Sequence, residues 1–156
     1  VDSKYIKELI HIDDKVIEVL PTNQLGLEEK YYQKVPYENQ TLEIGEVRED
    51  FFGRIYGTRS GDKGGCANLG VWAKTEDAYS FLFDFLTVKK LKELLPDLES
   101  FEIDRYELPN IFSLNFYVHG ILQEGVSSST RMDGQAKSLG EYLRAKKINF
   151  PLQLLK

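Results

Sequence analysis

The chain has 156 residues, 42% hydrophobic and 29% charged, and is long enough to bury a core without disulfides or bound metal. Its 25 acidic residues outnumber its 20 basic ones, and a net charge of −5 provides no general positive field for nucleic-acid phosphates. No apolar run is long enough for a transmembrane helix. We therefore expect no nucleic-acid partner and no membrane partner.

The single cysteine, Cys66, cannot form an internal disulfide, which is typical of a protein in the reducing cytoplasm. Cys66 and the two histidines, His11 and His119, do not have the spacing of metal ligands. The sequence therefore predicts a cytoplasmic protein with no cofactor and no metal site.

Residues 1–45 are predicted to form an N-terminal helix followed by an extended arm. Apolar residues at near-helical spacing after Ser3, a residue suited to an N-cap, predict a helix over residues 3–12. Residues 15–20 fit either helix or a short strand, and Pro21 ends whichever forms. Two prolines and polar clusters then indicate an irregular or extended connection.

Residues 46–156 are predicted to form the main domain. Charge supports this division, because residues 1–50 carry 12 acids and 6 bases, whereas residues 51–156 carry 13 acids and 14 bases. Alternation and caps predict two strands, a helix begun by Thr75 and interrupted near Thr87, two more strands and a last helix. The expected ranges are strands through 46–58 and over 66–74, a helix over 75–97, strands over 101–109 and 113–122, and a helix over 132–147.

This order predicts an α+β fold. Two helices that each need apolar cover favour a two-layer sandwich, in which a four-stranded, mainly antiparallel sheet carries both helices on one face. Large aromatic residues should fill the space between the layers. The expected core aromatics are Trp72, Phe81, Phe83, Phe85, Phe112, Phe116 and Tyr117.

The segment RSGDKGG is the first candidate site. Its three glycines can adopt positive φ and let backbone N–H groups converge on an anion, and its two basic residues add charge. A tight hairpin would need the same glycines, with the Asp-Lys pair solvated at its tip. A serine nucleophile with a lysine base is a third interpretation, for which no apolar surroundings are evident. The candidate residues are Arg59, Ser60, Gly61, Asp62, Lys63, Gly64 and Gly65.

The second candidate segment is SSSTRMD, residues 127–133, just before the last predicted helix. Free N–H groups and the helix dipole favour an anion there, with Ser129, Arg131 and Asp133 as candidate site residues, although plain helix capping explains Ser129, Thr130 and Asp133 without a ligand. If both segments lie at one end of the sheet, Arg59, Lys63 and Arg131 should converge on one pocket.

Three other polar positions complete the candidate site. Asn68 lies in a strand pattern, where its amide needs a partner, and the glycine segment is the expected one. Asn110 lies in a turn after a strand, where it could cap or hydrogen-bond, and Glu107 could pair with Arg131. His119 is expected to be an ordinary core or edge histidine.

RSGDKGGCANLGVWAK, followed by RYELPNIFSLNFYVHGILQEGVSSSTRMDGQAKSLGEYL, resembles the C-terminal, ferredoxin-like domain of the acyclic terpene utilisation (AtuA) family. The resemblance covers about residues 46–146, although Cys66 stands where the family often has an acidic or small residue. In that family a larger N-terminal domain usually precedes this one. The resemblance implies a link to bacterial catabolism of branched or terpenoid acyl compounds, with a large AtuA-type domain or protein as partner.

Two functions therefore remain open, besides a purely structural role as a cap on a partner in which the glycine segment is merely a turn. In the first, the chain is an accessory or assembly domain, and because ferredoxin-like sheets often associate through faces or edges, a homo-oligomer is expected. In the second, it is a small enzyme or enzyme subunit whose two loops bind the carboxylate or CoA phosphate of an acyl-CoA or carboxylate substrate.

Overall fold

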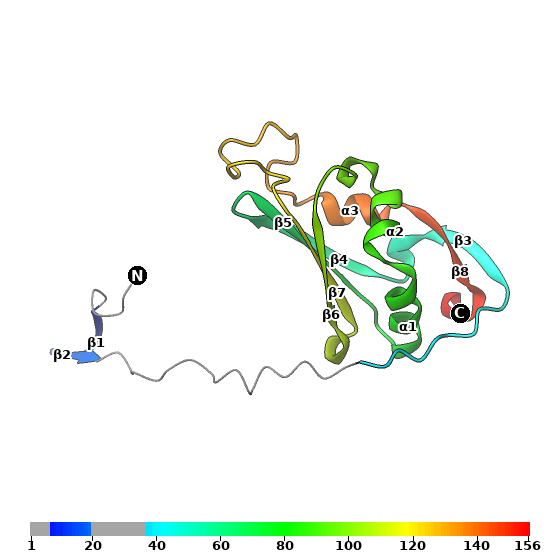
Figure 1. Ribbon diagram of the computed structural model, residues 1–156. Coiled ribbons are helices and arrows are strands. Elements are labelled where there is room, and N and C mark those ends of the chain that lie inside the picture. The colour runs from blue at the N-terminus through cyan, green and yellow to red at the C-terminus, as the bar shows by residue number, and fades with distance from the viewer. Residues whose placement is uncertain (1–6, 20–36) are drawn as a thin grey trace. The chain divides into compact units, whose positions relative to one another are not determined.

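The structure, a computed structural model, describes residues 7–19 and 37–156 (Figure 1). The chain divides into one compact unit that ends at Pro36 and a second that spans Tyr37–Lys156. The second unit begins before the expected boundary at residue 46. Tyr37 and Leu42 pack against its core, and the Asn39 amide donates a 3.1 Å hydrogen bond to the carbonyl of Ser80.

The first unit contains a β-hairpin, so residues 15–19 take the strand alternative, whereas residues 8–12 are strand where a helix was expected. Strand β1 (Glu8–Ile12) pairs antiparallel with β2 (Lys15–Val19), and Asp13 in the two-residue turn has a φ of 51°. The predicted helix over 3–12 is therefore wrong over residues 7–12, while residues 3–6 and 20–36 lie outside the described residues. The apolar residues of this short segment fit both the period of a helix and the period of a strand. The left-handed turn at Asp13 favours the strand, because it joins the two halves as a hairpin.

A four-stranded antiparallel sheet forms the centre of the second unit, with three strands in their predicted segments and the first strand over Gly57–Lys63 in place of 46–58. Its strands stand in the order β4 (Gly57–Lys63), β5 (Cys66–Trp72), β7 (Ser113–Val118) and β6 (Ile103–Leu108). Since β7 lies between β5 and β6, the helical connection from β5 to β6 crosses one intervening strand. That split β-α-β connection is characteristic of ferredoxin-like domains.

The helices lie on one side of this sheet (Figure 1). The expected helix over 75–97 is two helices, α1 (Glu76–Phe85) and α2 (Val88–Leu94), which meet at the predicted interruption. The Thr75 and Thr87 hydroxyls accept hydrogen bonds from the N–H groups of Ala78 and Lys90, so each threonine caps one helix. The 3-10 helix η4 (Pro96–Leu98) follows α2.

The last predicted helix, over 132–147, is much shorter than expected. Only α3 (Leu139–Arg144) is helical, because the Asp133 carboxylate accepts hydrogen bonds from the N–H groups of Lys137 and Ser138 and holds the preceding residues in turns. The short α3 packs against β4 and against the 3-10 helix η3 (Phe52–Arg54).

A two-stranded ribbon on the helix-covered side of the main sheet was not predicted (Figure 1). Strand β3 (Val47–Phe51) pairs antiparallel with β8 (Lys147–Pro151), joining two ends of the second unit. The expected strand through 46–58 is thus divided into β3, η3 and β4. Two further 3-10 helices, η5 (Pro109–Ile111) and η6 (Leu152–Leu155), follow β6 and β8.

The core lies between the helices and the sheet. Leu69, Leu114 and Phe116 are fully buried on the covered face, and Leu82 and Leu91 meet them from α1 and α2. Of the expected core aromatics, Phe81 and Phe116 are buried and Phe83, Phe85 and Phe112 pack at the margin. The prediction was wrong for Trp72 and Tyr117, which lie on the opposite face of the sheet because they alternate with buried residues. Among the described residues, no helix is long and apolar enough to cross a membrane.

Candidate functional site

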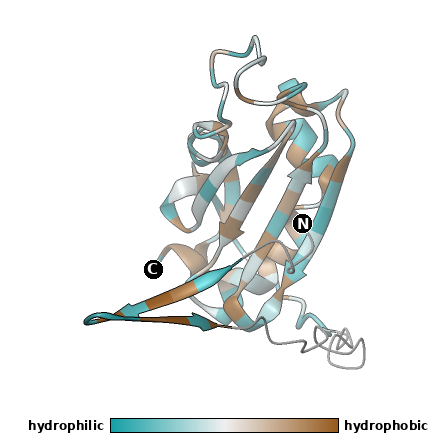
Figure 2. Ribbon diagram, turned by 90° about the vertical axis from the view of Figure 1, so that its left-hand side faces the viewer, coloured by the Kyte–Doolittle hydropathy of each residue, from teal (hydrophilic) through white to brown (hydrophobic). Residues whose placement is uncertain are grey.

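The second face of the four-stranded sheet carries no helix of the described residues, and we call it the open face. In the view of Figure 2, hydrophilic and hydrophobic residues alternate along the strands. The register fixes which side chains share this face, because paired residues point to the same side of a sheet. They are Gly57, Arg59, Gly61 and Lys63 on β4; Cys66, Asn68, Gly70 and Trp72 on β5; Ser113, Asn115 and Tyr117 on β7; and Asp104, Tyr106 and Leu108 on β6.

One end of the open face is apolar. Trp72 is 40% exposed, Leu108 42% and Tyr106 52%, and Ile111 projects nearby from η5. The Trp72 ring lies over Gly57 on the neighbouring strand, where an added Cβ would overlap it. Exposed aromatic and aliphatic side chains grouped in this way are typical of a surface that contacts another protein.

A pair of amides occupies the middle of the open face. The Asn68 side-chain amide donates a 3.4 Å hydrogen bond to Oδ1 of Asn115 on β7. The expected bond from Asn68 to the glycine segment is therefore replaced by a cross-strand bond. Arg59 lies at the edge of the same face, opposite Gly70, with an exposed side chain.

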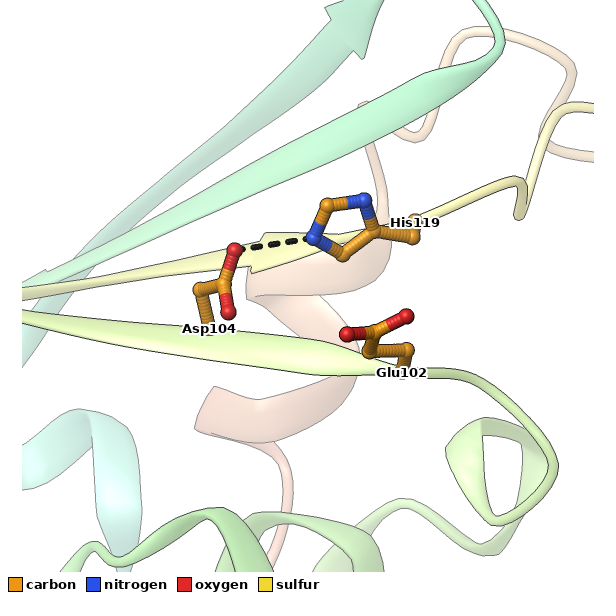
Figure 3. A group of neighbouring side chains, drawn as sticks. All are labelled: Glu102, Asp104 and His119. Carbon is orange, nitrogen blue, oxygen red and sulfur yellow. Dashed lines mark hydrogen bonds and ion pairs between the residues drawn. The ribbon is translucent and has the colours of Figure 1, made fainter.

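The other end of the open face gathers titratable side chains. His119 Nε2 lies 2.8 Å from Oδ2 of Asp104, and the Glu102 carboxylate stands beside them (Figure 3). Tyr117 contacts the His119 ring edge-on, with the ring centroids 4.9 Å apart. A hydrogen bond with Cys66 raises the pKa of Tyr117 above its usual value. His119 is thus paired with a carboxylate, on a half-exposed surface.

The segment RSGDKGG is mainly strand and not loop. Arg59 to Lys63 belong to β4, and only Gly64 and Gly65 form the turn that connects it to β5, with a φ of 62° at Gly64. Lys63 donates a 2.8 Å hydrogen bond from Nζ to the carbonyl of Asp62. A hairpin turn therefore accounts for Gly64 and Gly65, whereas Gly61 and the Asp-Lys pair expected at the tip lie within β4. Gly65 packs so closely on the carbonyl of Gln123 that no Cβ would fit.

Ser60 points away from the open face and fastens another element. Its buried hydroxyl accepts a 3.0 Å hydrogen bond from Gly140 N–H and lies 3.2 Å from the Lys137 carbonyl, to which it donates. Lys63 and Ser60 stand on opposite faces of β4, so the structure separates the serine from the lysine suggested as its base.

The segment 127–133 forms turns beside a pocket. Ser129 Oγ accepts a hydrogen bond from Arg131 N–H, and Arg131 and Asp133 line a pocket of about 430 Å³. The other lining residues are Leu95, Asp97, Leu98, Met132, Ser138, Leu139 and Tyr142. The predicted convergence is not found, because neither Arg59 nor Lys63 lines this pocket. Asp97 and Asp133 line the pocket together with Arg131, and two negative side chains against one positive do not favour an anionic ligand.

The remaining predicted residues are placed elsewhere. Glu107 pairs with Arg105 at 2.7 Å, not with Arg131 as expected. Asn110 is exposed in η5, at the apolar end of the sheet. Sequence reasoning missed the grouping of Glu102 and Asp104 with His119, although alternation with the buried Val118 placed that histidine away from the core.

Comparison with known proteins identifies one family. The family model described as the AtuA ferredoxin-like domain matches residues 53–149, which confirms the expected resemblance over most of the second unit. No curated protein and no solved structure was found to match the chain.

Proposed function

The chain belongs to the AtuA ferredoxin-like domain family, and on that basis we propose that it is an accessory domain of AtuA-like proteins that assembles through its open face with a second copy of itself. As the family resemblance implies, this assembly would serve bacterial catabolism of branched or terpenoid acyl compounds, alongside a large AtuA-type domain or protein. The observation that carries the proposal is the distribution of charge and apolar surface on the open face.

Opposite charges stand at opposite edges of this face. Lys63 and Arg59 lie on the edge strand β4, whereas Glu102 and Asp104 lie at the other edge, in and before β6. Lys63 and Glu102 also occupy the same level along the strands. Lys63 pairs with Cys66, the register that pairs Ala67 with Val118 sets Cys66 level with His119, and the His119 N–H donates to the Glu102 carbonyl. The face therefore carries positive charge on one side and negative charge on the other.

A two-fold axis parallel to the strands, between β5 and β7, turns this distribution into complementarity. It places β4 of one copy over β6 of the other, so that Lys63 meets Glu102 and Arg59 meets Tyr106 of the second copy. In a symmetric dimer each such contact occurs twice. Arg59 over an aromatic ring and Lys63 beside a carboxylate are both favourable pairs.

The apolar end of the open face supplies the buried apolar area that a dimer needs and that charged pairs do not provide. Leu108 is 42% exposed and Trp72 40% exposed, and both would lose water contact in a face-to-face dimer. Burial of apolar surface contributes about 25 cal/mol per Å², and aromatic residues dominate the centres of such interfaces. This apolar end would set the affinity, and the charges would set the orientation.

Sedimentation of the full chain tests the proposal through Leu108. Leu108→Arg places a charge in the dimer interface and should convert the chain to a monomer. Met132→Arg, at a fully exposed position outside the sheet, is the matched control and should leave the dimer intact. A wild-type chain that is monomeric, or two variants that behave alike, would overturn the proposal.

The enzyme alternative makes a different prediction. It requires an anion-binding pocket, and the pocket beside Arg131 also contains Asp97 and Asp133. On the assembly account, CoA, short branched acyl-CoAs and simple carboxylates should not raise the melting temperature. Saturable stabilisation that disappears in Arg131→Ala would favour the enzyme.

A further inference from the structure

We propose that Glu102, Asp104 and His119 form a binding site for a divalent transition-metal ion such as Zn²⁺, at the polar end of the open face (Figure 3). One ligand atom of each residue lies within 4.8 Å of those of the others. The inference concerns metal binding by a single chain and does not depend on the proposed dimer.

The backbone brings these three residues together from separate parts of the sequence. Asp104 lies in β6 and Glu102 just before it, whereas His119 directly follows β7 and bonds Glu102 through its backbone N–H. Residues at positions 102 and 104 of an extended chain point to the same side. All three side chains therefore project from one end of the β6–β7 strand pair.

The ligand atoms of the three residues are close enough to reach one metal ion after small rotations of their side chains. His119 Nε2 and Asp104 Oδ2 lie 2.8 Å apart as a hydrogen-bonded pair, whereas two ligands of a tetrahedral zinc at about 2.1 Å stand roughly 3.4 Å apart, so metal binding must replace this bond and separate the two atoms slightly. Glu102 must approach by a rotation of its exposed side chain. Contact with the Tyr117 ring holds the imidazole edge-on, which limits the freedom that metal binding must remove.

The donor set distinguishes among metals. Two carboxylates balance the charge of a divalent cation, and an imidazole nitrogen suits zinc and its neighbours better than magnesium or calcium. Three protein ligands leave a coordination position open for water or a further ligand. The thiol of Cys66 accepts a 3.4 Å hydrogen bond from Gly120 N–H, and the proposed ligand set does not include it.

Calorimetric titration of the full chain with ZnCl₂ tests the site. We expect one Zn²⁺ per chain, no displacement by excess Mg²⁺, and an affinity reduced at least about tenfold by His119→Ala or Asp104→Asn. His11→Ala removes the other histidine of the chain and should leave the affinity unchanged. Leu108→Arg should also bind Zn²⁺, since each chain supplies all three ligands.

Three outcomes would overturn the proposal. The first is the absence of saturable Zn²⁺ binding, and the second is equal affinity in wild type and in a His119→Ala variant shown to be folded by circular dichroism. The third is loss of binding in Cys66→Ser together with its retention in His119→Ala, which would make the thiol the ligand.

Discussion

The backbone N–H of Gly140 donates a 3.0 Å hydrogen bond to the hydroxyl of Ser60, which lies 80 positions earlier in the chain. The bond fixes the first turn of α3 to the covered side of β4. It also explains the glycine, because a Cβ at position 140 would lie 2.7 Å from Oγ1 of Thr58. Ser60, which the sequence predicted to bind a ligand, therefore holds the sheet to α3 through this hydrogen bond.

Gly140→Ala should destabilise the chain by about 1–3 kcal/mol, since the new methyl group overlaps the Thr58 side chain. This sign is opposite to the gain of about 1 kcal/mol that alanine normally brings to a helix. Urea unfolding measures the difference. Combining the change with Thr58→Ala should recover part of the loss, whereas a gain of stability in Gly140→Ala alone would contradict the packing.

Ser60→Ala should lower the free energy of unfolding by about 1–3 kcal/mol, because the buried Gly140 N–H and the partly buried Lys137 carbonyl both lose a hydrogen-bond partner. Ser100→Ala, at an exposed position, is the matched control and should change stability by less than about 0.5 kcal/mol. Equal effects of the two changes in chemical denaturation would remove the fastening role of Ser60.

Tyr56 and Tyr79 are both buried but should respond differently to loss of the hydroxyl group. Tyr56 donates a 2.9 Å hydrogen bond to the Ala78 carbonyl, so Tyr56→Phe should cost about 1 kcal/mol or more. The Tyr79 hydroxyl has no hydrogen-bond partner within the described part of the chain. Tyr79→Phe should therefore be neutral or stabilising at pH 7 in the same unfolding experiment.

Alkaline unfolding provides a separate test of Tyr79. Burial raises its pKa from 10.0 to about 12, so the neutral phenol is favoured in the folded chain. Stability should fall as the pH rises from about 10, where the unfolded tyrosine ionises, towards 12. Tyr79→Phe should reduce this fall, while Tyr142→Phe, at an exposed position, should not. Identical alkaline profiles for the two variants would contradict the burial argument.

Local signals predicted much of the second unit. Thr75 and Thr87 mark the starts of α1 and α2 through their own side chains, and the glycines mark the β4–β5 turn. Residues 7–12 of the first hairpin fit both the helical and the strand period, so the spacing of their apolar residues does not decide between the two structures. There the turn at Asp13 decides between strand and helix.

Long-range pairing could not be predicted in the same way. Strand β8 contains Pro151 and follows a helix without a clear turn signal, and its partner β3 lies about 100 positions earlier in the chain. The group of Glu102, Asp104 and His119 likewise depends on the register of β6 with β7. Spacing along the chain does not reveal which residues a sheet places side by side.

Sedimentation equilibrium of charge-exchanged chains, in EDTA to remove any metal contribution, tests the proposed assembly most directly. Wild type should be a dimer at micromolar concentration, Lys63→Glu and Glu102→Lys should each shift it to monomer, and the double variant should dimerise again because each exchanged pair is restored. A wild-type monomer at about 100 μM, or a double variant that stays monomeric, would contradict the face-to-face dimer.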